Sequence, residues 1–296
     1  LTMINKFLEY IKVEKRYSNH TVKGYHQDLN NFLIFLKKSE GTENLIDVDK
    51  KIIRNFMVSL TEKGLSKRSI NRILSSLRSF YHFLLKLGII EVSPLEEIKS
   101  LKFNPEKQIP ISEDEMNGLQ EIYTSQNVCI FEMLIVEILY QTGMRRAELC
   151  NMEMKNVDFV NGQIKIFGKK NKERIIPISR DLSKMMEAYL QERKTLPEFE
   201  QYFFVGKRGK KLNEGVVYTI VKKYLTLINT SKEKRSPHIL RHSFATHILN
   251  NGAEISKVRT LLGHSSLSST QVYTDANIEQ LKNIFKNTHP RAQKED

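Results

Sequence analysis

Apolar residues recur at helical spacing along residues 3–88, in four segments that short loops separate. The first segment carries Ile4, Phe7 and Ile11 on one face, and the fourth begins at Ser66, a residue type that commonly caps a helix. None of the four segments has the alternating pattern that is typical of a strand. The pattern predicts an N-terminal domain built from four helices.

The stretch SLKFNPEKQIP interrupts this periodicity. It contains Pro105 and Pro110, and proline-containing stretches without apolar periodicity commonly join domains. We therefore predict an N-terminal domain at residues 1–100, a linker at 101–110 and a second domain at 111–296. At 296 residues, the chain is long enough for each domain to bury a core of its own.

The second domain mixes helices with a few strands. Val128–Tyr140 is the most apolar stretch of the chain and predicts a buried helix. Gln163–Phe167 and Glu173–Ile178 alternate on either side of Gly168–Asn171, which predicts a β-hairpin, and Tyr202–Val205 predicts one more short strand. We expect a mainly α-helical chain with a small β-sheet in its C-terminal domain.

Charge narrows the functional classes. The chain has 47 Lys and Arg against 34 Asp and Glu, a net charge of +13, and both halves divided at Ser100 are basic. This balance favours a polyanionic partner, with nucleic acid as the leading candidate. No apolar run has the length of a membrane span, and no secretory signal is evident. Cys129 and Cys150 are expected to be reduced, buried thiols in helices of a cytoplasmic protein.

A basic face accompanies the apolar stripe of the fourth N-terminal helix. Its basic residues are Lys67, Arg68, Arg72 and Arg78, with Asn71 and Ser75 between them. Such a face can contact DNA phosphates and base edges, and we predict that its four basic residues bind DNA. A solvated helix surface is the other explanation for the same charges.

The stretch SPHILRHSFATHILNNG, residues 236–252, has a helix start signal at its Ser-Pro pair and a stop signal at its final glycine. Its apolar face indicates a buried helix, yet His238, Arg241 and His242 lie in neighbouring turns. The two histidines have the spacing of a zinc-hydrolase helix without its glutamate, and Arg241 would repel a divalent cation, so we expect no metal site. His242 and His247 are interpreted as structural residues with satisfied hydrogen bonds.

Two further stretches offer groups that suit a phosphate. In TGMRRAEL, a buried helix is predicted to end at Gly143 and another to begin near Arg145, whose guanidinium offers a fork of donors. A surface ion pair between Arg145 and Glu148 explains the same residues equally well. In LLGHSSLSSTQVYT, His264 follows a glycine at the predicted end of a helix, and Tyr273 comes nine residues later.

Together, and in this order, the motifs resemble those of the tyrosine recombinase (phage integrase-like) family, Xer type. HTVKGYHQDLNNFLIF resembles the N-terminal helices of that family, TGMRRAEL its first arginine motif and GKKNKERIIPI its lysine hairpin. HILRHSFATH resembles its His-x-x-Arg helix, LLGHSSLSSTQVYT the segment with its second histidine and tyrosine, and HPRA its usual ending. The resemblance covers nearly the whole chain.

The resemblance implies a set of catalytic residues. Carried over residue by residue, the set is Arg145, Lys169, His238, Arg241, His264 and the nucleophile Tyr273. Glu148, three residues after Arg145, is expected to hold that arginine or a neighbour in place. Arg146 is the alternative to the first arginine, and Lys170 and Lys172 are the alternatives to the lysine.

A fold, a reaction and partners are implied as well. The fold is a C-shaped DNA clamp of two domains, a four-helix SAM-like core-binding domain and a mixed α/β catalytic domain. The reaction cuts and rejoins double-stranded DNA through a 3′-phosphotyrosyl intermediate and a Holliday junction, without metal, cofactor or ATP. A homo- or hetero-tetramer, with a second Xer recombinase and an FtsK-type translocase as partners, would resolve chromosome dimers at a dif-type site during chromosome segregation.

The segment DANIEQLKNIFKN, which follows Tyr273, is expected to form a C-terminal exchange helix. By resemblance, it docks on a neighbouring protomer, and the apolar stripe of Ile278, Leu281 and Phe285 supports such a contact. The same stripe can also pack against its own chain.

Other functions fit part of this pattern. An integrase or transposase of a mobile element would use the same chemistry, but no arm-binding domain precedes Met3, which favours the Xer role. A type IB topoisomerase would share the chemistry and act on one duplex without pairing two sites. From a different class, a non-catalytic DNA-binding protein would carry the same basic charge, but the complete residue set argues against it.

Overall fold

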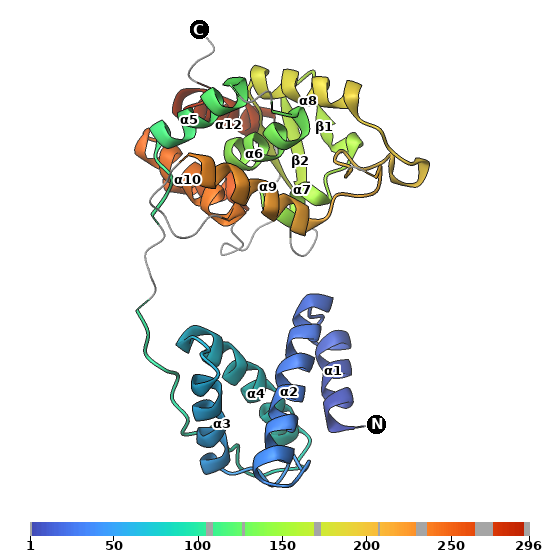
Figure 1. Ribbon diagram of the computed structural model, residues 1–296, viewed down its shortest axis with the longest axis vertical. Coiled ribbons are helices and arrows are strands. Elements are labelled where there is room, and N and C mark those ends of the chain that lie inside the picture. Colours follow the sequence, from blue (N-terminus) through green and yellow to red (C-terminus); the bar gives the residue numbers. More distant parts are fainter. Residues whose placement is uncertain are drawn as a thin grey trace. The chain divides into compact units, whose positions relative to one another are not determined.

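The computed structural model describes residues 2–104, 109–125, 128–168, 173–206, 208–228, 236–263 and 275–292. The chain divides into two compact units, Leu1–Glu106 and Lys107–Asp296. Figure 1 draws the two units, and buried apolar side chains give each of them a hydrophobic core of its own. Within the described residues, no helix combines the length and the apolar character that crossing a membrane requires.

The described residues of the first unit form four helices, α1 (Met3–Val13), α2 (Asn19–Ser39), α3 (Lys50–Glu62) and α4 (Lys67–Lys86). Each helix begins after a residue whose side chain accepts a hydrogen bond from a first-turn N–H group: Thr2, Ser18, Asp49 and Ser66. One fully buried phenylalanine from each helix enters the core: Phe7, Phe32, Phe56 and Phe80. The four predicted N-terminal helices are therefore confirmed.

The end of the first unit is fastened to α4. The side chain of Asn71 binds both backbone groups of Leu101, at 2.8 Å to its N–H and 2.9 Å to its carbonyl. In the second unit, the N–H group of Ile111 donates to Ser243 Oγ at 2.8 Å. The predicted linker at 101–110 thus begins with a residue that the first unit holds, and Ile111 after it belongs to the second core.

The second unit contains eight α-helices, three strands and two short 3₁₀ turns among its described residues. In chain order they are α5 (Glu113–Ser125), α6 (Ile130–Thr142), α7 (Arg146–Cys150), η1 (Met154–Asn156), β1 (Val157–Asp158), β2 (Gln163–Phe167), β3 (Glu173–Pro177), α8 (Arg180–Glu192), η3 (Pro197–Phe199), α9 (Glu214–Leu227), α10 (Pro237–Asn250), α11 (Ile255–Leu262) and α12 (Asp275–Thr288). The mainly helical fold with one small sheet is confirmed.

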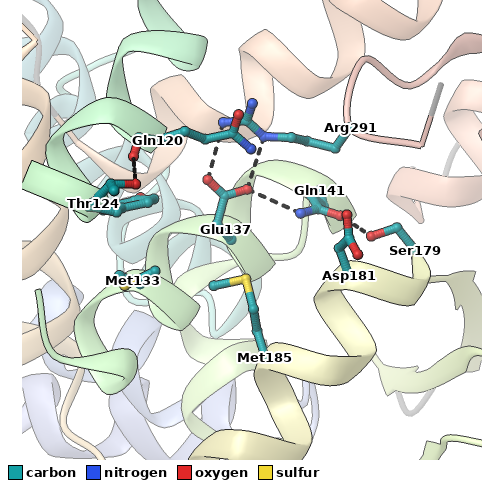
Figure 2. A pocket seen from close by; sticks show the side chains of 10 residues that line it. Gln120, Thr124, Met133, Glu137, Gln141, Ser179, Asp181, Met185 and Arg291 are labelled. Atoms are coloured by element: carbon teal, nitrogen blue, oxygen red, sulfur yellow. Dashed lines mark hydrogen bonds and ion pairs between the residues drawn. The ribbon is translucent and has the colours of Figure 1, made fainter. Parts of the chain in front are cut away.

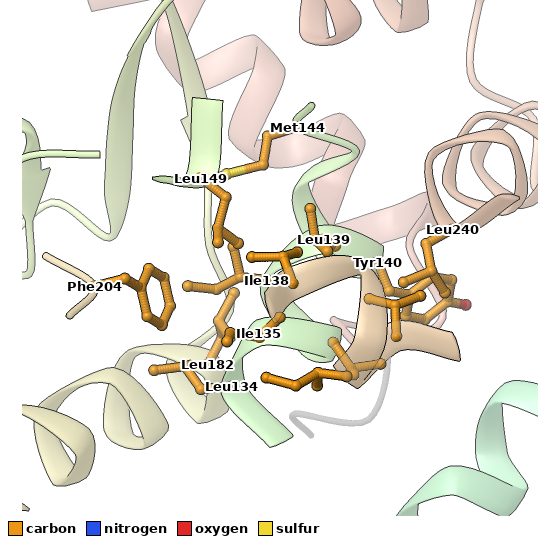
Figure 3. Close-up of a cluster of buried hydrophobic side chains, with 14 of the residues drawn as sticks. Leu134, Ile135, Ile138, Leu139, Tyr140, Met144, Leu149, Leu182, Phe204 and Leu240 are labelled. Atoms are coloured by element: carbon orange, nitrogen blue, oxygen red, sulfur yellow. The ribbon is translucent and has the colours of Figure 1, made fainter. Parts of the chain in front are cut away.

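Helix α6 forms the centre of the second unit. It packs against α8, α9 and α10, and every residue from Leu134 to Thr142 is buried. Figure 3 shows Ile135 and Ile138 of α6 among side chains from other elements, including Leu182 of α8 and Phe204. The buried helix predicted from the most apolar stretch is confirmed, two residues further along the chain.

The sheet is antiparallel, in the order β1-β2-β3, and confirms the predicted hairpin. The short strand predicted at Tyr202–Val205 is wrong. Tyr202 and Val205 each form only an isolated bridge, to Glu153 and Lys211 respectively. Between them Phe203 and Phe204 are both fully buried, so consecutive side chains enter the core and the segment does not pair along its length.

The prediction for the cysteines is half correct. Cys150 is buried at the end of α7, and burial raises the pKa of its thiol to about 12. Cys129 is exposed, because α6 begins one residue later and leaves this cysteine at the N-cap. Its neighbours in sequence are apolar, which hid the helix boundary.

The C-terminal helix packs against its own chain. Leu281 and Phe285 of α12 are buried in a cluster with Phe244 of α10 and with Leu261 of α11. Beyond α12, Arg291 forms an ion pair with Glu137 of α6, and both side chains are only 4% exposed (Figure 2). The apolar stripe of α12 therefore packs against its own chain, which is the second of the two predicted alternatives.

The last buried residues include a histidine whose titration can be measured. His289 is fully buried and stacks on Phe285 at 4.9 Å between ring centroids, and burial lowers the pKa of its imidazole to about 3. Below an ordinary histidine pKa of 6.5, the unfolded chain takes up a proton that the folded chain does not. This contribution to stability is therefore complete above pH 6.5 and is lost as the pH falls toward 3.

We expect His289→Phe to reduce the acid sensitivity of the second unit. The free energy of unfolding of the wild type should fall by about 1.4 kcal/mol per pH unit below pH 6.5 through this histidine alone. Denaturant unfolding at pH 6.5 and pH 5 measures the difference between the two proteins. Equal pH slopes in both would mean that His289 titrates normally in the folded chain.

Candidate active site

Three helix ends converge at the candidate site. Helix α6 ends at Gly143, which adopts a left-handed φ of +60°, and α7 begins after Arg145. Helix α11 ends at Gly263, also left-handed with a φ of +66°. The predicted end of one helix at Gly143 and start of another near Arg145 are both confirmed. Because α7 has only five residues, its dipole adds little charge to the site.

A buried carboxylate organises the site. Glu148 of α7 accepts hydrogen bonds from the backbone N–H of Arg145 at 2.8 Å and from Arg145 Nη1 at 2.9 Å. On its other side, Arg174 of β3 donates through Nη1 and Nη2 at 3.0 and 2.6 Å. The side chains of Arg174 and Glu148 are 4% and 7% exposed, whereas that of Arg145 is 33% exposed. One carboxylate thus serves two arginines, one buried and one open to solvent.

The charge of Glu148 is secured by these donors. Burial alone would raise the pKa of this carboxyl group, but the paired contacts of Arg174, together with those of Arg145, hold it below the ordinary value of 4.5. Glu148 is therefore an anion at neutral pH. It can compensate one of the cationic charges around it.

Arg241 of α10 is the third guanidinium of the cluster. Its Nη1 donates to the Gly143 carbonyl and its Nη2 to the Leu262 carbonyl, both at 2.6 Å, so it satisfies the ends of two helices. Burial, together with the charges of Arg145 and Arg174, lowers the pKa of this guanidinium to about 10. Three cations around one carboxylate leave a net positive charge that an anion would neutralise.

Helix α10 also carries two histidines of its motif, His238 and His247. His238 is exposed, one turn before Arg241, on a helix that confirms the prediction for residues 236–252. His247 is buried, with Nδ1 2.9 Å from the Tyr140 hydroxyl and Nε2 2.8 Å from the Ile111 carbonyl oxygen. Its interpretation as a structural histidine with satisfied hydrogen bonds is confirmed.

The remaining candidate residues fall into two groups, those outside the described residues and those within them. Lys169 with its two alternatives, His264 and Tyr273 lie outside the described residues. Gly168 immediately precedes the lysines after β2, and Gly263 immediately precedes His264 at the end of α11. Among the described candidates, Arg145, Glu148 and Arg241 are brought together. Arg146 is directed elsewhere, since its Nε donates to Glu214 of α9 at 2.9 Å.

Arg174 is the residue that sequence reasoning missed. It stands opposite Ile166 in the β2–β3 ladder and two residues before Ile176, and both isoleucines are buried. Alternation along β3 therefore places Arg174 on the face that points into the protein. A buried arginine requires an anionic partner, and this alternation is the signal that could have identified it.

The basic face of α4 divides into two pairs. Lys67 and Arg68 are exposed at the start of the helix. Arg72 instead binds Asp28 of α2 through both terminal nitrogens, at 2.6 and 2.7 Å, although its side chain remains 59% exposed. Arg78 donates to the Ile98 carbonyl at 2.6 Å. Two of the four predicted DNA contacts thus also hold the first unit together.

Comparison with known proteins identifies the class of this site. Residues 109–280 match the phage integrase family, and residues 4–88 match the phage integrase N-terminal SAM-like domain. The chain belongs to the phage integrase family, whose members are tyrosine recombinases that cleave and religate DNA in site-specific recombination. The family predicted from the motifs is confirmed.

The relatives are of the Xer type. Tyrosine recombinase XerC of Oceanobacillus iheyensis is 38% identical over 297 residues, which cover 98% of this chain and 96% of the relative. Tyrosine recombinase XerD of Staphylococcus haemolyticus is 33% identical over 300 residues, with 98% and 99% covered. A crystal structure of XerH recombinase bound to a palindromic difH substrate shares the fold, with a TM-score of 0.70, 21% identity and coverage of 96% and 94%.

The turn at Gly143 provides a test of how tightly the site is packed. A Cβ atom at this position would lie 2.5 Å from Phe244 Cδ1 and 2.8 Å from Leu262 Cδ2. Any residue that replaces Gly143 would also have to adopt its left-handed backbone conformation. Gly88, after α4, has a similar φ of +65° with nothing within 4 Å of its Cβ position. The two glycines therefore differ in packing and share their backbone requirement.

We expect Gly88→Ala to lower the free energy of unfolding of the first unit by about 1–2 kcal/mol, the cost of the left-handed backbone. Gly143→Ala should lower that of the second unit by about 1–3 kcal/mol more, because overpacking adds to it. Denaturant unfolding of both variants provides the comparison. Similar losses of unfolding free energy in the two variants would show that the side chains around Gly143 move aside at little energetic cost.

Proposed function

We propose that this chain is an Xer-type recombinase that exchanges DNA strands at a specific site through a 3′-phosphotyrosyl intermediate. The observation that carries the proposal is the cluster of Arg145, Arg174 and Arg241 around the single carboxylate of Glu148, with its surplus of positive charge. A phosphodiester carries one negative charge and, during displacement, accumulates charge on its non-bridging oxygens. Planar guanidinium groups are suited to stabilise that charge.

In the proposed cleavage, Tyr273 Oη attacks the scissile phosphorus and its bond to the 5′-oxygen breaks. His238 accepts or orients the tyrosine proton, and Lys169 donates a proton to the departing 5′-oxygen, with Lys170 and Lys172 as alternative donors. His264 donates to a non-bridging oxygen. The products are a 3′-phosphotyrosyl enzyme and a free 5′-hydroxyl, so the bond energy is retained and no ATP is consumed.

Arg145 and Arg241 would stabilise the phosphate directly. The geometry supports this role for Arg145 over Arg146, because Arg145 shares the carboxylate of Glu148 with Arg174, whereas Arg146 is bound to α9. Arg241 uses one N–H of each terminal nitrogen on helix carbonyls, and a guanidinium has five donors. Guanidinium groups fixed in advance need little reorganisation when charge develops on the phosphate.

Double-stranded DNA is the proposed substrate, and we propose that both units bind it. The net charge of +13 supports this, as do Lys67 and Arg68, whose exposed side chains are suited to phosphate contacts. Arg72 keeps more than half of its side-chain surface exposed and remains a candidate contact, now with a fixed orientation. Arg78 is the least suited of the four because its guanidinium binds a carbonyl.

Strand exchange would take place in a homo- or hetero-tetramer that passes through a Holliday junction. We further propose that the target is a dif-type site and that the biological role is the resolution of chromosome dimers, with a second Xer recombinase and an FtsK-type translocase as partners. The XerC and XerD relatives support this role, and the solved XerH neighbour was crystallised on a difH substrate. Docking of α12 on a neighbour would require Leu281 and Phe285 to leave their own core.

The proposal is tested by trapping the covalent intermediate. A duplex nicked a few nucleotides to the 3′ side of the scissile phosphate releases, after cleavage, the short fragment that carries the free 5′-hydroxyl. Rejoining is then prevented, and the protein stays attached to the 3′-phosphate of the DNA. We expect Tyr273→Phe to abolish this adduct and to leave DNA affinity unchanged, because only one oxygen atom is removed. Denaturing gels measure the adduct, and peptide mapping locates it.

Tyr218→Phe is the control, since it removes the same oxygen atom from an exposed tyrosine of α9 that has no role in the proposed cleavage. It should form adducts at the wild-type rate. Persistent 3′-linked adducts in Tyr273→Phe would assign the nucleophile to another residue. Absence of any adduct from the wild type on dif-like DNA, with binding intact, would instead favour a non-catalytic DNA-binding protein.

A further inference from the structure

Arg174 is buried among residues that belong to separate parts of the site. Its two terminal nitrogens bind Glu148 of α7, and its Nε donates to the Leu261 carbonyl of α11 at 2.9 Å. A Cβ atom at Gly263 would come within 3.1 Å of Arg174 Cδ, so the glycine allows α11 to end directly against this side chain. Every nitrogen of the guanidinium therefore donates within the protein.

The segments joined by Arg174 are those that carry the proposed catalytic residues. Glu148 fixes Arg145 through a backbone and a side-chain contact. The end of α11 immediately precedes His264, and β3 immediately follows the hairpin residues that include Lys169. A shift of one side chain would thus be transmitted to several members of the proposed set.

We propose that Arg174 is a positioning residue for DNA cleavage, which sets the orientation of Arg145 through Glu148. It is not a catalytic residue, because it is buried and its nitrogens are bound to protein oxygens. This inference rests on the proposed function, in which Arg145 stabilises the charge of the scissile phosphate. Arg174 acts indirectly, because it holds the carboxylate of Glu148, which in turn holds Arg145.

A buried ion pair can also serve stability alone, and the chain contains a matched example. Arg291 binds Glu137 through Nε and Nη2, both at 3.2 Å, and joins the C-terminal segment to α6. Like Arg174, Arg291 has a further contact with a backbone carbonyl, that of Met116. Arg291→Lys is therefore the control for losing a buried arginine–glutamate contact elsewhere in the second unit.

The test uses two nicked duplexes that differ only at the scissile position, with either a phosphodiester or a methylphosphonate. The methylphosphonate replaces one non-bridging oxygen with a methyl group and carries no negative charge, so its cleavage depends less on a correctly placed guanidinium. A general structural defect would slow both substrates to the same extent. The ratio of the two single-turnover rates therefore separates positioning of Arg145 from loss of structure.

We expect Arg174→Lys to slow cleavage of the phosphodiester about tenfold to a hundredfold, because small misplacements of a reacting geometry have effects of this size. Cleavage of the methylphosphonate should change by less than about threefold, and Arg145→Ala should show the same selective pattern more strongly. Arg291→Lys should change both rates by the same factor. Wild-type rates in Arg174→Lys, or equal slowing of both substrates, would overturn the inference.

Two further results keep the inference distinct from the proposed function. Failure of wild-type protein to cleave, or equal slowing of both substrates by Arg145→Ala, would contradict the proposed function itself. Thermal unfolding shows whether each variant is folded. If Arg174→Lys does not fold, the double variant Arg174→Met with Glu148→Met replaces the pair by apolar groups, which buried ion pairs often tolerate. The same substrate selectivity is expected from it, and equal slowing would again overturn the inference.

Discussion

The arrangement of the site depends on one buried carboxylate, that of Glu148, shared between Arg145 and Arg174. Guanidinium groups that approach one another repel, and the repulsion is visible in Arg241, whose pKa is lowered to about 10 by burial and by the two neighbouring arginines. Glu148 offsets part of this charge, and the carbonyls at the ends of α6 and α11 offset more. Helices that end at the site thus make it possible to keep three cations there, and a bound phosphate would complete the compensation.

Much of this architecture follows from local pattern in the sequence. The apolar spacing predicts the four helices of the first unit, the central helix α6 and the hairpin of β2 and β3. Each of these elements is indicated by the hydrophobic pattern within its own segment of the chain. The cluster was predicted in part, because Arg145, Glu148 and Arg241 lie in recognisable motifs. Arg174 was missed because its partner lies 26 residues earlier and only the short alternation of β3 indicates its burial.

Long-range contacts also decide what local pattern leaves open. Lys67, Arg68, Arg72 and Arg78 share one helix face. A buried aspartate 44 residues away binds Arg72, and the Ile98 carbonyl binds Arg78, which distinguishes these two from the other pair. Likewise, the apolar stripe of α12 is compatible with packing in cis or on another protomer, and only the cluster that contains Phe244 shows which contact the isolated chain makes. Amphipathic spacing reports that a face is buried and does not identify what covers it.

The central claim is that fixed arginines provide the electrostatic stabilisation for which many phosphoryl-transfer enzymes use a metal ion. The direct measurement is the single-turnover rate of adduct formation on a nicked duplex in excess EDTA, compared with the rate in magnesium. The account predicts equal rates for the wild type, together with a loss of about a hundredfold to a thousandfold in Arg241→Ala at unchanged DNA affinity. Loss of cleavage in EDTA that magnesium restores would contradict it.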